Sequence, residues 1–133
     1  MKILFVCKYN RFRSRVAEFL FNKYNRSKNN SAKSVGLIKG AYPLDRQEVT
    51  TAAKVGIILK GRPSGISTEL LKWQDAIVIV ADDVPKSVFK ENEKYGKRLI
   101  VWKIPDTKSD KEQEIIRIIK MIDNKIKELV AQK

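Results

Sequence analysis

The sequence predicts a doubly wound α/β fold, in which a four-stranded parallel sheet carries helices on both faces. Two observations lead to this prediction. Short apolar runs alternate with helical segments along the chain, an order typical of βαβ units. The most apolar run, Ala76–Val80, contains no polar residue, as expected of a parallel strand that is covered on both faces. With 133 residues, the chain is expected to form one compact domain over 1–133.

Four segments have the composition of β-strands. Each is a short run rich in apolar or β-branched residues, and polar stretches bound it. The predicted strands are Lys2–Val6, Ala32–Leu37, Ala76–Val80 and Arg98–Trp102. Helical segments separate them, which favours parallel pairing through crossover connections.

Five segments are predicted to be helices. The last is the clearest, because its apolar residues recur three and four positions apart. Gly56 follows the second segment where the C-terminal stop of a helix is expected. The predicted helices are Val16–Tyr24, Leu44–Ala53, a short helix that opens at Ser67, Val84–Tyr95 and Lys111–Val130.

The composition limits the chemistry available. The chain has no histidine and a single cysteine, Cys7. These counts exclude a Ser–His–Asp triad, a Cys–His pair, the usual zinc sites and an intramolecular disulfide. The net charge of +13 favours anionic partners such as phosphorylated protein, small phosphates or nucleic acid, although a lysine-rich composition alone would also produce it.

No segment has the length of a membrane span. The longest apolar run, Ala76–Ala81, is far shorter than the roughly 20 residues that a transmembrane helix needs. The N-terminal apolar run is too short for a signal peptide and lacks a small-residue cleavage site. We therefore expect a cytoplasmic protein that does not associate with membranes.

The loop after the first strand, Cys7-Lys-Tyr-Asn-Arg-Phe-Arg-Ser14, has the pattern of a phosphate loop. A short loop that enters a helix N-terminus turns its backbone N–H groups inward, and the helix dipole adds positive potential. The planar guanidinium of Arg13 could hold two anion oxygens at once. The residues expected to bind phosphate are Lys8, Tyr9, Asn10, Arg11, Phe12, Arg13 and Ser14.

Cys7 is expected to lie directly beneath the bound anion. The positive field there favours the thiolate, which is the nucleophilic form of cysteine. We expect Ser14 to hydrogen-bond the sulfur, and Asn10 to brace the loop in a left-handed backbone conformation. The alternative is that Cys7 is a small apolar residue at a strand end, the commoner role of a lone cysteine.

Residues 6–18 resemble the signature of the low-molecular-weight protein tyrosine phosphatases, Cys-x-Gly-Asn-x-Cys-Arg-Ser-Pro-x-Ala-Glu. The resemblance covers nearly the whole chain, since further family stretches match Ser34–Gly36, Gly56–Ile57, Ile66–Leu70 and Asp75–Val80. It implies hydrolysis of phosphomonoesters, phosphotyrosine protein or aryl phosphates in particular, through a cysteinyl-phosphate on Cys7. Inorganic phosphate would be the product.

The resemblance also implies a general acid. The family carries an Asp-Pro pair in a late loop, and Asp106 matches its aspartate by position. Asp106 would protonate the leaving oxygen and then activate water. A turn or capping role for Asp106 stays open, with Asp110 as the competing acid. Asp82 and Asp83 are further alternative acids, although solvated side chains are expected there. The candidates for aromatic walls around the substrate ring are Tyr9, Tyr42 and Trp102.

The chain departs from the family pattern at several positions. Where the family has a loop glycine, a second cysteine, a proline after the signature serine and a proline after the acid, this chain has Tyr9, Phe12, Arg15 and Thr107. The family histidine near position 62 is absent, with Arg62 as the nearest match. The support that Asn10 receives is therefore expected to differ.

Two other functions remain open. The same loop could bind phosphate, a phosphoprotein or, less favourably, nucleic acid without turnover. A thioredoxin-coupled arsenate reductase also binds an oxyanion at such a loop, but it needs further cysteines, and this chain has one. For the phosphatase we expect no metal and no other cofactor, because Arg13 and the backbone supply positive charge.

Overall fold

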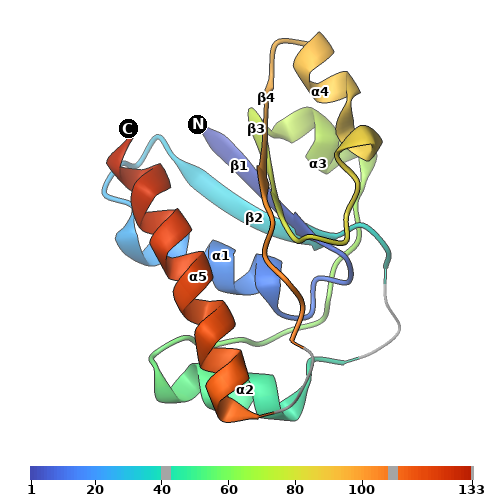
Figure 1. The fold of residues 1–133 in the computed structure, drawn as a ribbon. Coiled ribbons are helices and arrows are strands. Elements are labelled where there is room, and N and C mark those ends of the chain that lie inside the picture. The colour runs from blue at the N-terminus through green and yellow to red at the C-terminus, as the bar shows by residue number, and fades with distance from the viewer. Residues whose placement is uncertain (40–42, 108–110, 133) are drawn as a thin grey trace.

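A four-stranded parallel sheet forms the centre of the molecule (Figure 1). The computed structural model describes residues 1–39, 43–107 and 111–132. The strand order is β2-β1-β3-β4, and every neighbouring pair is parallel. The strands are β1 (Lys2–Cys7), β2 (Ser31–Gly36), β3 (Ala76–Val80) and β4 (Arg98–Trp102). The predicted doubly wound α/β class is thereby confirmed.

Helices cover both faces of the sheet, and two apolar cores result. On one face α1 and α5 pack together across the sheet, with α2 at the end of α5, whereas α3 and α4 lie on the other (Figure 1). None of the described helices is long and apolar enough to cross a membrane. The helices are α1 (Arg13–Tyr24), α2 (Arg46–Lys54), α3 (Thr68–Trp73), α4 (Glu91–Lys94) and α5 (Glu112–Ala131).

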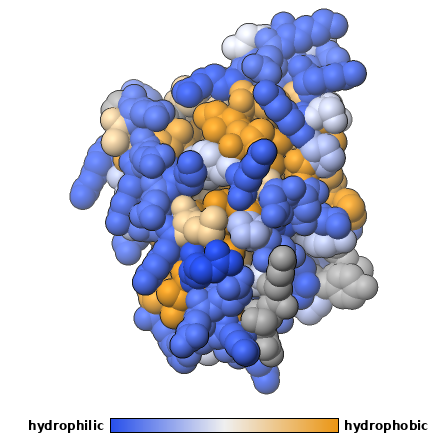
Figure 2. Space-filling view, viewed as in Figure 1, coloured by the Kyte–Doolittle hydropathy of each residue, from blue (hydrophilic) through white to orange (hydrophobic). Residues whose placement is uncertain are grey.

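Strand β1 supplies side chains to both cores because successive residues of a strand point to opposite faces. Ile3 and Phe5 enter the core beneath α1 and α5, whereas Leu4 and Val6 enter the core beneath α3. The edge strand β4 is less enclosed. A hydrophobic patch in Figure 2 lies over it, where Leu99, Ile100 and Val101 are only half-buried.

The order of the strands positions the site. From β1 the chain crosses to β2 on one side and then returns to β3 on the other, so the direction of winding reverses between β1 and β3. Ligands of such sheets bind in the crevice at the carboxyl ends of the strands where this reversal occurs. Residues 7–14 follow β1 at this point, and Asp82 and Asp83 follow β3 beside them.

Local signals account for several helix ends. The Asp45 side chain accepts a hydrogen bond from the backbone N–H of Glu48 at 2.9 Å, and so caps α2. Gly56 follows α2 with a φ of 84°, as the predicted stop requires. Helix α1 begins at Arg13, one turn before the predicted Val16, since the Phe12 carbonyl already accepts a bond from the Val16 N–H.

The predicted helix over Val84–Tyr95 was wrong. This segment forms a 3₁₀ turn, η1 (Lys86–Phe89), followed by the single turn of α4. Each piece is anchored by its own side chain. Phe89 enters the core, while the Asn92 amide donates to the Arg98 carbonyl at 2.7 Å and also bonds Gln74. These tertiary contacts outweigh the helix propensity of the segment.

Candidate active site

A buried hydrogen-bond network fixes the loop around Cys7. The Cys7 sulfur lies 3.0 Å from the Ser14 hydroxyl, which also accepts a bond from the Asn10 side-chain amide at 2.8 Å. The same amide donates to the Ser34 hydroxyl on β2. Asn10 has a φ of 56°, in the left-handed region. Both expected contacts, from Ser14 to the sulfur and from Asn10 to the loop, are therefore present.

Two further contacts hold Asn10 from outside the loop or from the next helix. The Asn10 side-chain oxygen accepts a bond from the Ser64 N–H at 2.8 Å. Arg15 donates to the Asn10 carbonyl at 2.6 Å and to the Lys60 carbonyl at 2.7 Å. Burial lowers the pKa of Arg15, against the opposing influence of Glu18 and of Cys7. Arg15 thus connects the loop to the segment that contains Lys60.

Gly36, at the end of β2, faces the loop backbone. A Cβ atom at this position would lie 2.6 Å from the carbonyl carbon of Tyr9 and 2.8 Å from the backbone nitrogen of Asn10. Neither backbone atom can move without shifting the loop. The close approach of Tyr9 to β2 therefore requires glycine at position 36, and the tyrosine in place of the family glycine is accommodated against it.

The loop carbonyls are bound from outside the loop. The carbonyls of Cys7 and Lys8 accept bonds from the N–H groups of Leu37 and Ile38 at 2.8 and 2.9 Å. In a trans peptide the next N–H points the opposite way, so the amides of Lys8 and Tyr9 face away from these partners. Helix α1 has no side-chain cap and no acidic residue in its first turn. This end of the helix suits an anion.

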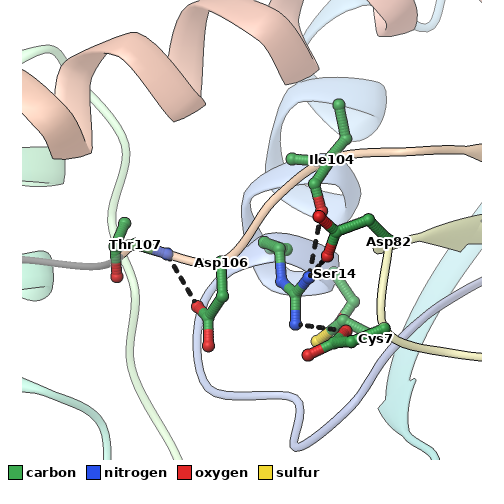
Figure 3. A network of polar contacts seen from close by, with 8 residues as sticks. Cys7, Ser14, Asp82, Ile104, Asp106 and Thr107 are labelled. Carbon is green, nitrogen blue, oxygen red and sulfur yellow. Dashed lines mark hydrogen bonds and ion pairs between the residues drawn. The ribbon is translucent and has the colours of Figure 1, made fainter.

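Arg13 lies in the first turn of α1 and is 3% exposed. Its guanidinium donates to the Ile104 carbonyl at 3.0 Å and to the Asp83 carboxylate at 3.0 Å, with Asp82 at 3.7 Å (Figure 3). Asp82 and Asp83 are exposed, as expected, but both also face the Arg13 guanidinium, a pairing that was not predicted. Their position after β3, beside β1, is the sequence signal that could have placed them here.

Asp106 follows β4 in an exposed loop. Its carboxylate accepts a bond from the Thr107 N–H at 2.9 Å, and in the view of Figure 3 it lies between Thr107 and Ser14. Ile104, two residues before Asp106, is buried and gives its carbonyl to Arg13. Arg13 therefore connects the loop that bears Cys7 with the loop that bears Asp106.

The remaining predicted side chains have separate surroundings. Lys8 lies over the Tyr9 ring, with its ammonium 5.3 Å from the ring centre. Arg11 donates to the Pro43 carbonyl at 3.0 Å. The Phe12 side chain is buried in the core, so only its backbone can contact an anion.

One of the candidate aromatic walls is a core residue. Trp102 is 7% exposed and packs against Phe5 in the core, so as a wall of the substrate site it was a wrong candidate. Tyr42 and Asp110 lie outside the described residues. Within residues 1–39, 43–107 and 111–132, no group of three or more His, Cys, Asp or Glu side chains could hold a metal ion.

The fold and the site together define an α/β protein with a phosphate-loop architecture, in which a cysteine ends the central strand and an arginine begins the next helix. The sequence model of the family described as low molecular weight phosphotyrosine protein phosphatase matches residues 2–133. The chain therefore belongs to this family, and membership supports a phosphatase activity.

Solved structures share the fold over almost their whole length. A low molecular weight protein tyrosine phosphatase from T. tengcongensis is 22% identical with a TM-score of 0.85, covering 100% of this chain and 99% of that one. The YwlE arginine phosphatase from Geobacillus stearothermophilus is 19% identical with a TM-score of 0.82, covering 98% and 91%. An arsenate reductase from Archaeoglobus fulgidus is 27% identical with a TM-score of 0.74, covering 97% and 98%.

Proposed function

We propose that the protein hydrolyses phosphomonoesters through a phosphocysteine on Cys7. The thiolate attacks phosphorus, and the bond from phosphorus to the leaving oxygen breaks while Asp106 gives that oxygen a proton. Asp106 then takes a proton from water, which attacks the phosphocysteine and releases inorganic phosphate and the thiolate. The observation that carries this proposal is the Cys7–Ser14 contact at the uncapped N-terminus of α1, with Arg13 in the same helical turn.

Arg13 and the loop amides would bind the three non-bridging oxygens of the phosphoryl group. This arrangement places donors where negative charge accumulates during transfer, which is how phosphoryl transfer is generally accelerated. In the structure Arg13 is bound to carboxylates, so an incoming phosphate competes with Asp82 and Asp83 for the guanidinium. Ser14 is placed to stabilise the thiolate as it leaves phosphorus.

The proposed substrate class is phosphotyrosine in protein, or another aryl phosphate. The family to which the chain belongs is described by that substrate. Basic residues in the loop, Lys8, Arg11 and Arg15, favour acidic residues around the phosphorylated one. Arsenate reduction is the weaker candidate, because one cysteine cannot form the disulfide that a thioredoxin-coupled reductase passes on.

The test is hydrolysis of p-nitrophenyl phosphate and of a phosphotyrosine peptide in the presence of EDTA. We expect the wild type to turn over both substrates, and Cys7→Ser to lose at least about 10⁴-fold in rate. Cys7→Ser should still bind phosphate, which isothermal titration calorimetry can measure. A wild type that binds phosphate or vanadate without turnover would instead identify a non-catalytic phosphate-binding protein.

The substrate class needs a second comparison. A phosphoserine peptide and a phosphoarginine peptide of the same flanking sequence serve as matched controls for the phosphotyrosine peptide. We expect kcat/KM to be highest for phosphotyrosine. A higher kcat/KM for either control would leave the chemistry in place and overturn the proposed substrate.

A further inference from the structure

A buried carboxyl group lies beside the loop of Asp106 and has no part in the mechanism proposed above. Glu48, in the first turn of α2, is 7% exposed. A buried carboxyl group is costly unless it has a partner. Its partner is the hydroxyl of Thr107, which donates to the Glu48 carboxylate at 2.8 Å.

Thr107 joins two carboxyl groups. Its hydroxyl binds Glu48, and its backbone N–H binds the Asp106 carboxylate at 2.9 Å. The phosphatases that this chain resembles have proline after the acid, and proline offers neither a hydroxyl nor an N–H. The rigid ring is thus replaced here by two hydrogen bonds that reach from α2 to Asp106.

The charges around Glu48 are unfavourable for a purely structural group. The pKa of Glu48 is raised from 4.5 to about 7, chiefly by burial and also by the negative charges of Asp45 and Asp106, against the Thr107 hydrogen bond and the charge of Arg11. Elsewhere on this helix, the Lys54–Glu112 ion pair joins α2 to α5. An apolar residue on the same helix face would avoid these costs.

We propose that Glu48 is a positioning residue that holds the Asp106 loop through the hydroxyl of Thr107. The inference rests on the proposed role of Asp106 as general acid. When Glu48 lacks this contact, Thr107 is free to rotate, and Asp106 is held less firmly where a leaving oxygen would need its proton. The effect should therefore appear in proton delivery and leave phosphate binding unchanged.

Esters with different leaving groups test the proposal. Thr107 is only half-buried, so Thr107→Val keeps the shape of the side chain without opening the core. Phenolate needs protonation more than p-nitrophenolate does. We expect Thr107→Val to lower kcat/KM for phenyl phosphate about threefold to tenfold, with a smaller loss for p-nitrophenyl phosphate. The inhibition constant of inorganic phosphate should not change.

Further variants test whether Thr107 acts through its hydrogen bond to Glu48. Glu48→Ala should reproduce the Thr107→Val pattern, and the double variant should lose no more than either single one. Thr107→Ser should restore the rate. Glu48→Gln keeps an acceptor oxygen for the Thr107 hydroxyl, so its rate and its ratio of the two esters should stay near those of the wild type.

A matched control removes a buried hydroxyl that does not reach the acid loop. Thr51→Val, on the same helix, should leave the ratio of the two esters unchanged. An unchanged ratio in Thr107→Val, in an enzyme that loses activity with Asp106→Asn, would overturn the inference and leave the proposed function intact. A wild type that hydrolyses neither ester would overturn both the inference about Glu48 and the proposed function.

Discussion

The two loops that meet at the site are held in different ways. The Cys7 loop is fixed by buried bonds to its own helix and to β2, through Ser14 and Ser34, and it rests on the bare backbone of Gly36. The Asp106 loop is exposed and is held by contacts from distant segments, among them the bonds of Arg13 and of the Asp82 N–H to the Ile104 carbonyl and the Thr107 bond to Glu48.

The difference in support fits the different roles proposed for the two loops, anion binding for one and proton donation for the other. A site that binds an anion by backbone N–H groups must be preorganised, because every amide must point at the ligand before it arrives. A proton donor must serve leaving groups of different size, and so tolerates a less rigid support. We therefore expect the two loops to respond separately to substitution, and the four predictions below test this separation.

The largest expected effect comes from the acid itself. Asp106→Asn should lower kcat/KM for phenyl phosphate by roughly 10²–10⁴-fold, since the leaving oxygen then departs without a proton. The inhibition constant of phosphate should stay within about twofold of the wild type, because the Cys7 loop is untouched. Steady-state kinetics with both esters gives both quantities. Weakened phosphate binding in this variant would mean that the two loops are not separable.

The second prediction concerns stability and pH. The pKa of Glu48 is raised from 4.5 to about 7, so the folded chain binds more protons than the unfolded chain between these values. The stabilisation from this group is complete below its ordinary pKa and is lost as the pH rises through about 7. The difference corresponds to about 3 kcal/mol. Glu48→Gln should remove this pH dependence.

Urea unfolding at several pH values between 5 and 8 measures how the free energy of unfolding depends on pH. The free energy of unfolding of the wild type should fall with rising pH relative to that of Glu48→Gln. Parallel curves for the two proteins would show that Glu48 does not titrate in this range.

The third prediction concerns the Cys7 loop. Gly36→Ala should destabilise the protein by about 1–3 kcal/mol, because the new Cβ meets the backbone of Tyr9. Phosphate binding should weaken as the loop is displaced. Ser31→Ala, at the exposed start of the same strand, is the control and should change neither quantity. Thermal unfolding and calorimetry distinguish the two variants, and a Gly36→Ala protein with unchanged phosphate affinity would contradict the assigned contact.

The smallest effect is expected where the two loops meet. Asp83→Asn removes the carboxylate that competes with phosphate for Arg13, and phosphate affinity should rise about twofold to fivefold. Glu93→Gln removes an equal charge from the surface further along the chain and should leave the affinity unchanged. An equal gain in both variants would mean that net charge, and not the Arg13 contact, controls binding.

Most of the fold could be predicted from local patterns in the sequence. The uninterrupted apolar run of β3 and the strand β4 over Arg98–Trp102 have their predicted bounds, because each is a short run rich in apolar and β-branched residues, a signal that lies within the strand itself. The segment over Val84–Tyr95 has no such signal. Its conformation depends on Asn92 bonding Gln74 and the Arg98 carbonyl, contacts that no periodicity can show.

In the candidate site, too, the contacts between residues close in sequence were predictable and those between distant residues were not. The contacts that join Cys7, Asn10 and Ser14 were predictable because all three residues lie within the loop itself. The pairing of Arg13 with Asp83 joins residues seventy positions apart, and its only signal is the position of Asp83 after a neighbouring strand. Glu48 carries no sequence signal, since a glutamate in the first turn of a helix is normally explained by the helix dipole.

Gly36, Ser34 and Ser64 limit how far the Cys7 loop could be transplanted. Residues 7–14 inserted between a strand and a helix of another parallel sheet would bring the thiol, the guanidinium and the left-handed asparagine. They would bring neither the glycine surface on the adjacent strand nor the two groups that hold Asn10. A functional graft would therefore have to carry three separate stretches of chain, so this loop is not a self-contained module.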